Sequence, residues 1–221
     1  MEWYIYIRSK QFKLFTYFIF YSFLHLDLKP QNILVKQRVC MHGGEEECTK
    51  CGGTPVSKLS LKIADFGVSR CKADATECGY GIVSEIEQFG STLKGTIFYI
   101  APEILEKGIY KKYCDIYSFA VIMWEMITGE EPFSQTSPID VYNRWLDLPS
   151  TETIFDIPSC PKMLSDLMTV SLTKCYKKRP SFPQIEIILQ KCESNLKESI
   201  RNGEGIEANI VLRRPSYYIE L

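Results

Sequence analysis

The chain has 221 residues, with 26 basic and 27 acidic side chains and a formal net charge of −1 at pH 7. Hydrophobic residues make up 45% of it, so the chain can bury a core, and disorder of the whole chain is excluded. The balanced charge argues against a strongly basic nucleic-acid binder. The nine cysteines are an odd number in a chain that is not small, which fits poorly with a secreted disulfide scaffold.

The first segment, residues 1–24, is rich in aromatic side chains, and we predict that it is helical. Its apolar run from Leu14 to Leu24 is much shorter than the ~20 apolar residues that a membrane-spanning helix needs. The run is not followed by the small-residue cleavage site of a signal peptide. We therefore expect a cytoplasmic protein that binds neither membranes nor nucleic acid.

Two apolar runs farther along the chain predict a β-hairpin. Residues 33–35 and 59–64 have the composition of short strands. Between them, residues 36–58 form an insertion rich in cysteine and glycine, which we predict to be a loop at the tip of the hairpin. Glycines among polar side chains also predict a long mobile loop over residues 68–95.

The remaining part of the chain is predicted to be mostly helical. The stretch from Asp115 to Thr128 is apolar around most of its circumference, which indicates a helix that is buried on all sides. Gly129 follows it at the position where helices commonly end. Further helices are expected at residues 138–147, 161–174 and 183–197.

Three short motifs stand out because of their order along the chain. Residues 25–32 read HLDLKPQN, residues 65–67 read DFG directly after a predicted strand, and residues 101–103 read APE. In this order they resemble the signature set of a protein kinase. The resemblance continues in GTIFY at 95–99, DIYSF at 115–119 and RPSF at 179–182.

This resemblance implies a fold of the α+β class, namely the mostly helical C-terminal lobe of a protein kinase with a small β-hairpin. The lobe would span residues 25–197, with the cysteine-rich insertion at 36–58 and the activation segment at 65–103. The aromatic segment 1–24 would precede it, and a tail at 198–221 would follow.

The resemblance also implies roles for individual residues. Phosphoryl transfer depends mainly on positioning and on neutralising charge. Asp27 matches the catalytic base that orients the attacking hydroxyl, and Lys29 matches a cation that contacts the transferred phosphoryl group. Asn32 and Asp65 match the oxygen ligands of the Mg²⁺ that accompanies ATP. Gly67 completes the cofactor-binding motif and permits a tight backbone turn.

Four further residues are implied to support the site. Thr96 would form a hydrogen bond near Asp27, and Asp115 would hold the backbone of the catalytic loop from the buried helix. Glu103 would pair with Arg179 inside the lobe, and the loss of one partner would leave an uncompensated charge.

The expected function is transfer of the ATP γ-phosphate to a serine or threonine hydroxyl of a protein substrate. Lys29 within DLKPQN is typical of serine/threonine kinases, and the segments around Asp115 and Arg179 are most similar to the tyrosine-kinase-like group. A second protein partner is expected on the helical lobe.

Two features depart from the family pattern. Leu26 stands where many kinases have an arginine that pairs with a phosphorylated activation loop, so phosphorylation of that loop is predicted not to be the switch. We find no GxGxxG motif and no VAIK-like lysine before His25, so we expect the N-terminal lobe to be missing. The alternative function is therefore a catalytically inactive kinase-lobe fragment, or a pseudokinase-like scaffold that binds protein partners.

The insertion at 36–58 contains potential zinc ligands. A two-residue gap between cysteines lets both thiolates reach one ion. We predict a structural Zn²⁺ site, for which Cys71 and Cys78 are alternative partners, built from Cys40, His42, Cys48 and Cys51.

Overall fold

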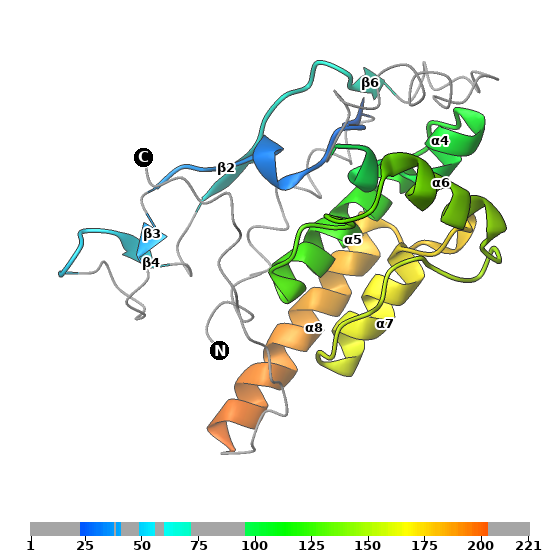
Figure 1. Ribbon diagram of the computed structural model, residues 1–221. Coiled ribbons are helices and arrows are strands. Elements are labelled where there is room, and N and C mark those ends of the chain that lie inside the picture. The colour runs from blue at the N-terminus through cyan, green and yellow to red at the C-terminus, as the bar shows by residue number, and fades with distance from the viewer. Residues whose placement is uncertain (1–22, 38, 41–48, 56–59, 72–95, 203–221) are drawn as a thin grey trace.

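The computed structural model of the chain describes residues 23–37, 39–40, 49–55, 60–71 and 96–202. Its helices gather into one body, and strands β2, β3 and β4 lie to one side of it (Figure 1). The elements, with η for 3₁₀-helices, are β1 (Phe23–Leu24), η1 (Pro30–Asn32), β2 (Ile33–Val35), β3 (Val39–Cys40), β4 (Thr54–Pro55), β5 (Leu61–Ile63), β6 (Arg70–Cys71), η4 (Thr96–Tyr99), α4 (Pro102–Lys107), α5 (Tyr113–Thr128), α6 (Pro138–Asp147), α7 (Lys162–Ser171), η5 (Tyr176–Lys178) and α8 (Phe182–Arg201).

The predicted hairpin is present as the antiparallel pair of β2 and β5. Ile33 lies opposite Ile63, and Val35 lies opposite Leu61. The second strand is shorter than predicted, because Ser60 and Ala64 lie outside it. The insertion between them contains a further strand pair that was predicted to be loop, since β3 and β4 pair in parallel.

The prediction of a helix up to Leu24 is wrong for the two residues of this segment that the structure describes. Phe23 and Leu24 form strand β1, which pairs antiparallel with β6. Aromatic residues are common in strands as well as in buried helices, so composition did not distinguish the two. The backbone partners, Arg70 and Cys71, lie far along the chain and decided the outcome.

Helix α5 is the centre of the core, as its apolar composition predicted. It ends at Gly129, which adopts a left-handed conformation (φ 68°) and donates its N–H to the carbonyl of Glu125 at 2.7 Å. Side chains on every side of the helix are buried, including Asp115, Ile116, Tyr117, Ser118, Phe119, Ala120, Val121, Ile122 and Met123. Other segments of the chain can therefore pack against α5, and bond to its polar side chains, on every side.

The three further helices that were predicted are present, and two of them differ from the prediction at their ends. Helix α6 has the predicted bounds, and α7 is shorter than the predicted 161–174. Helix α8 continues to Arg201, four residues into the predicted tail. The short helix α4, after Ala101, was not predicted. Within the described ranges, no helix is both long and apolar enough to cross a membrane.

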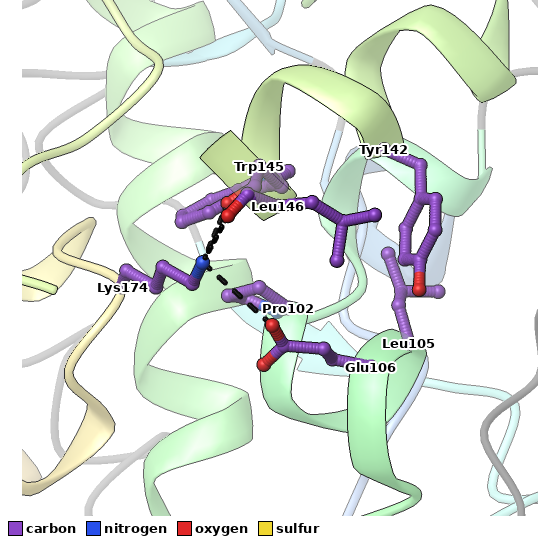
Figure 2. Close-up of a pocket in the computed structure, with 7 residues that line it drawn as sticks. All are labelled: Pro102, Leu105, Glu106, Tyr142, Trp145, Leu146 and Lys174. Carbon is purple, nitrogen blue, oxygen red and sulfur yellow. Dashed lines mark hydrogen bonds and ion pairs between the residues drawn. The ribbon is translucent and has the colours of Figure 1, made fainter. Parts of the chain in front are cut away.

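Lys174 joins α6 to α4 across a small hollow (Figure 2). Its Nζ lies 2.7 Å from the carbonyl of Trp145 and 3.0 Å from that of Leu146, at the end of α6 where backbone carbonyls lack partners within the helix. The same ammonium lies 3.6 Å from Glu106 of α4. One cation therefore holds α6 against α4, the helix that begins within the APE motif.

A buried ion pair joins the APE motif to the loop before α8. Arg179 donates to both carboxylate oxygens of Glu103 at 2.8 and 2.9 Å, and the two residues are 3% and 4% exposed. Arg179 also donates to the carbonyls of Tyr113 and Thr173. The implied Glu103–Arg179 pair is therefore present, and its polar atoms are satisfied.

We expect Arg179→Met to lower the free energy of unfolding by about 3–5 kcal/mol, because it leaves the Glu103 carboxylate buried without its partner. Urea unfolding would measure this loss. The double variant that also carries Glu103→Met should be more stable than Arg179→Met, since the unpaired charge is gone. Lys162→Met, which breaks the exposed pair with Asp166, is the control and should cost only about 0.3–0.5 kcal/mol. Equal losses in the two single variants would contradict this account.

Candidate active site

Asn32 and Asp65, from two of the motifs, lie at one end of the β2–β5 pair. Asn32 directly precedes β2, and Asp65 follows β5 after one residue. Because the strands are antiparallel, the start of β2 lies beside the end of β5. The N–H of Ala64 donates to the carbonyl of Asn32 at 2.9 Å and continues the pairing beyond the strands. This brings the HLDLKPQN and DFG motifs together.

Asp27, Lys29 and Asn32 form one hydrogen-bonded cluster. The amide Nδ2 of Asn32 donates to the side-chain Oδ2 of Asp27 at 2.9 Å and to its backbone carbonyl at 2.8 Å. The Nζ of Lys29 lies 2.8 Å from the same Oδ2. In the described part of the chain, no hydrogen bond uses the other oxygen, Oδ1. The carboxylate is therefore oriented through one oxygen, Oδ2, by an amide and an ammonium group.

His25 connects the loop of residues 25–32, called the catalytic loop below, to the end of the chain segment that leads into Asp65. Its Nδ1 accepts the N–H of Asp27 at 3.3 Å, so the ring proton lies on Nε2, which donates to the carbonyl of Ala64 at 3.0 Å. The ring of Phe66 packs edge-on against it, with centroids 4.9 Å apart. The imidazole thus joins residues 25–27 to the residue before the DFG motif.

Asp115 of α5 binds the backbone of the catalytic loop, as the family resemblance implied. Its two carboxylate oxygens accept the N–H groups of His25 and Leu26, each at 2.8 Å, and it is fully buried. Burial raises the pKa of this carboxyl, and the two N–H donors oppose the rise. Leu26 has φ 67°, in the left-handed region that costs an ordinary residue about 1–2 kcal/mol. The Asp115 bonds offset that strain.

The DFG turn is also strained at one residue. Asp65 has φ 62°, and its Oδ1 accepts the N–H of Gly67 at 3.3 Å. A Cβ at position 67 would lie 3.3 Å from the same oxygen, so a larger residue would crowd the carboxylate. The position therefore favours glycine for the tight turn that was predicted here.

Comparisons with known proteins agree with this geometry. A family model described as "Protein kinase domain" matches residues 13–190. The chain belongs to the protein kinase family. The predicted hairpin, helical lobe and motif order are thus those of a kinase.

Three curated relatives illustrate the kinases to which this chain is similar. It is 32% identical over 166 residues to "Mitogen-activated protein kinase kinase kinase mlk-1" of Caenorhabditis elegans, covering 73% of this chain and 14% of that protein. It is 31% identical over 204 residues to "Ankyrin repeat and protein kinase domain-containing protein 1" of Homo sapiens (87% and 23%). It is 30% identical over 168 residues to human "Mitogen-activated protein kinase kinase kinase 7" (76% and 22%).

These matches confirm the predicted resemblance to the tyrosine-kinase-like group of serine/threonine kinases. The chain spans less than a quarter of the length of each of the three relatives. The similarity therefore concerns the kinase domain and gives no information about the other parts of those proteins.

Several predicted site residues lie outside the described part of the kinase. The backbone of Thr96 belongs to η4, but its side chain is not among the described ones. His42 and Cys48 of the predicted zinc set lie outside as well, and for Cys40 only the backbone is described. Cys51 is a free, half-buried thiol. Among the described residues, no three metal-ligating side chains lie together.

Sequence reasoning missed the polar contacts around the activation segment. The hydroxyl of Ser69 donates to the carbonyl of His25 at 3.2 Å, which joins the start of this segment to the catalytic loop. At its other end, Tyr99 bonds to Ser118 and Glu125 of α5. A signal for the last contact was visible, since Glu125 is an acidic residue within an apolar helix.

We expect Asp115→Asn to lower the free energy of unfolding by about 1–3 kcal/mol, because the amide leaves one N–H of the loop without an acceptor. Urea unfolding with far-UV circular dichroism would measure it. Asp147→Asn, at an exposed position of α6, is the matched control and should stay within about 0.5 kcal/mol of the wild type. If Asp115→Asn were as stable as this control, the loop would not depend on the carboxylate.

Proposed function

We propose that this kinase transfers the γ-phosphate of ATP to a serine or threonine hydroxyl of a protein substrate. The observation that carries the proposal is the cluster in which Lys29 and Asn32 both bond to one oxygen of Asp27. That arrangement orients a carboxylate and places a cation beside it, as phosphoryl transfer requires. The family assignment and the kinase relatives support it.

Asp27 would act as the base. Its Oδ1 would accept the proton of the substrate hydroxyl, whose oxygen forms a bond to the γ-phosphorus. The bond from that phosphorus to the oxygen bridging to the β-phosphate breaks, and ADP leaves with this oxygen. Lys29 would move from Asp27 to the transferred phosphoryl group and stabilise its charge.

The donor set at the end of the β2–β5 pair fits Mg²⁺. Both Nδ2 hydrogens of Asn32 are used in bonds to Asp27, which leaves its carbonyl Oδ1 as an acceptor. Asp65 is exposed and offers a second hard oxygen ligand. Asn32 and Asp65 would hold the ion, which would neutralise charge on the phosphates of ATP.

The first test is Mg·ATP binding to the purified chain by calorimetry, followed by turnover on serine and threonine peptides. We expect Asp65→Ala to abolish binding, because it removes a metal ligand. Asp27→Asn should leave binding in place and lower kcat by about 10²–10⁴-fold, the usual contribution of a general base. Asp147→Asn should change neither.

Absence of Mg·ATP binding by the folded wild-type chain would contradict the proposal. The alternative, a pseudokinase-like scaffold that binds protein partners through its helical lobe, would then account for the family resemblance. Binding of Mg·ATP without turnover on any peptide would likewise contradict the proposed catalysis.

We further propose that Cys40, His42, Cys48 and Cys51 hold a structural Zn²⁺. Residues 49–51 form a turn, and Gly52 after it has φ 62° with open space around it, which suits the tight turn of a Cys-x-x-Cys knuckle. We expect zinc to copurify with the wild type in stoichiometric amount and to be lost in Cys51→Ser. Elemental analysis would measure it, with Cys175→Ser as the control that keeps its zinc. A zinc-free wild type would contradict this assignment.

A further inference from the structure

Two buried hydrogen bonds join the end of the activation segment to helix α5. The hydroxyl of Ser118 donates to the backbone carbonyl of Tyr99 at 2.7 Å, and the phenol of Tyr99 donates to Oε2 of Glu125. Tyr99 is 4% exposed and Glu125 is 2% exposed. Tyr99 ends η4, two residues before Ala101 and the APE helix. These bonds therefore determine how the segment enters the helical lobe.

The second carboxylate oxygen of Glu125 has no such partner. Oε1 is buried and forms no hydrogen bond in the described part of the chain. A buried carboxylate that lacks partners is costly when it is ionised. The titratable groups that act on it are Tyr99 from η4 and Glu131 from the loop after α5, and neither is a cation.

The environment of Glu125 therefore favours its protonated form. Burial raises the pKa of Glu125 from its ordinary value of 4.5 to about 7, and the charge of Glu131 adds to the rise. The hydrogen bond from Tyr99 opposes it. The pKa of Glu125 is higher in the folded state than in the unfolded state. Protonation of this carboxyl therefore stabilises the fold, fully below about pH 4.5, and this contribution is lost as the pH rises through 7.

We propose that Glu125 is a proton-sensitive joint between the activation segment and α5. When the carboxyl is protonated, one oxygen carries the proton, the other accepts from Tyr99, and η4 stays packed on α5. When it is ionised, the unpartnered Oε1 places a charge in the core, and η4 loosens so that water can reach it. The joint does not depend on phosphoryl transfer, so it stands or falls independently of the proposed function.

The test compares the wild-type chain of 221 residues with its Glu125→Gln variant at about pH 6 and about pH 8. The two pKa values predict a folding equilibrium constant about tenfold lower at the higher pH for the wild type, and no such contribution in Glu125→Gln. Hydrogen exchange, corrected for the intrinsic pH dependence of amide exchange, should show lost protection at residues 96–101 in the wild type. Residues in α8 serve as the internal reference. Parallel pH profiles in the two proteins would overturn the proposal.

Two variants that keep Glu125 make the test independent of how well Glu125→Gln folds. Glu131→Gln removes the neighbouring negative charge. It should lower the pH of the transition, that is, the pH at which residues 96–101 lose their protection from exchange. Tyr99→Phe removes the donor that favours the ionised form and should move it to higher pH. Opposite shifts are specific to titration of Glu125, because a purely structural role would change stability without moving the transition. Unshifted transitions in both variants would overturn the proposal.

Discussion

The carboxylate of Asp115 is the contact on which the rest of the site depends. It lies on the most deeply buried helix and accepts two adjacent backbone N–H groups of the catalytic loop. A loop of this kind has no regular backbone pairing of its own, so its donors need a partner from elsewhere. By accepting both, Asp115 permits the left-handed conformation of Leu26 and thereby sets the direction in which Asp27 leaves the loop.

Helix α5 distributes this support over the whole lobe. Its first turn contributes Asp115 under the catalytic loop and the Tyr113 carbonyl to Arg179. Farther along, Ser118 and Glu125 bind Tyr99 at the end of the activation segment. A helix that is buried on every side can contact several loops at once, which an amphipathic surface helix cannot do. The polar residues in its apolar sequence are therefore attachment points for the active site.

Most of these attachments are uncharged or internally satisfied, and Glu125 is the exception. Arg179 balances Glu103 with a bidentate pair, and Asp115 has a donor on each oxygen. Among the residues that the structure describes, Glu125 has a donor on one oxygen alone. Partners offset the cost of burial for the first two groups, and the lack of one at Oε1 underlies the proposed proton sensitivity of the third. Its position beside Tyr99 connects that sensitivity to the end of the activation segment.

The sequence alone determined the family, the hairpin and the central helix. The motifs HLDLKPQN, DFG and APE carry information in their order, and the apolar composition of residues 115–128 indicates burial without any structure. Ile33–Val35 and Pro138–Asp147 have the predicted bounds, and local features support both. The first is a short apolar run, and the second has Ser137 as its N-cap and a proline in its first turn.

Only the tertiary structure decided the features that depend on distant partners. Phe23–Leu24 became a strand through pairing with residues 70–71, and β3 pairs with β4 across the insertion. The bond between Tyr99 and Glu125 joins residues whose spacing carries no signal, and the positive φ of Leu26 follows from the Asp115 bonds. Sequence patterns report local periodicity and composition, whereas these contacts arise from which distant groups the packed core brings within hydrogen-bonding distance.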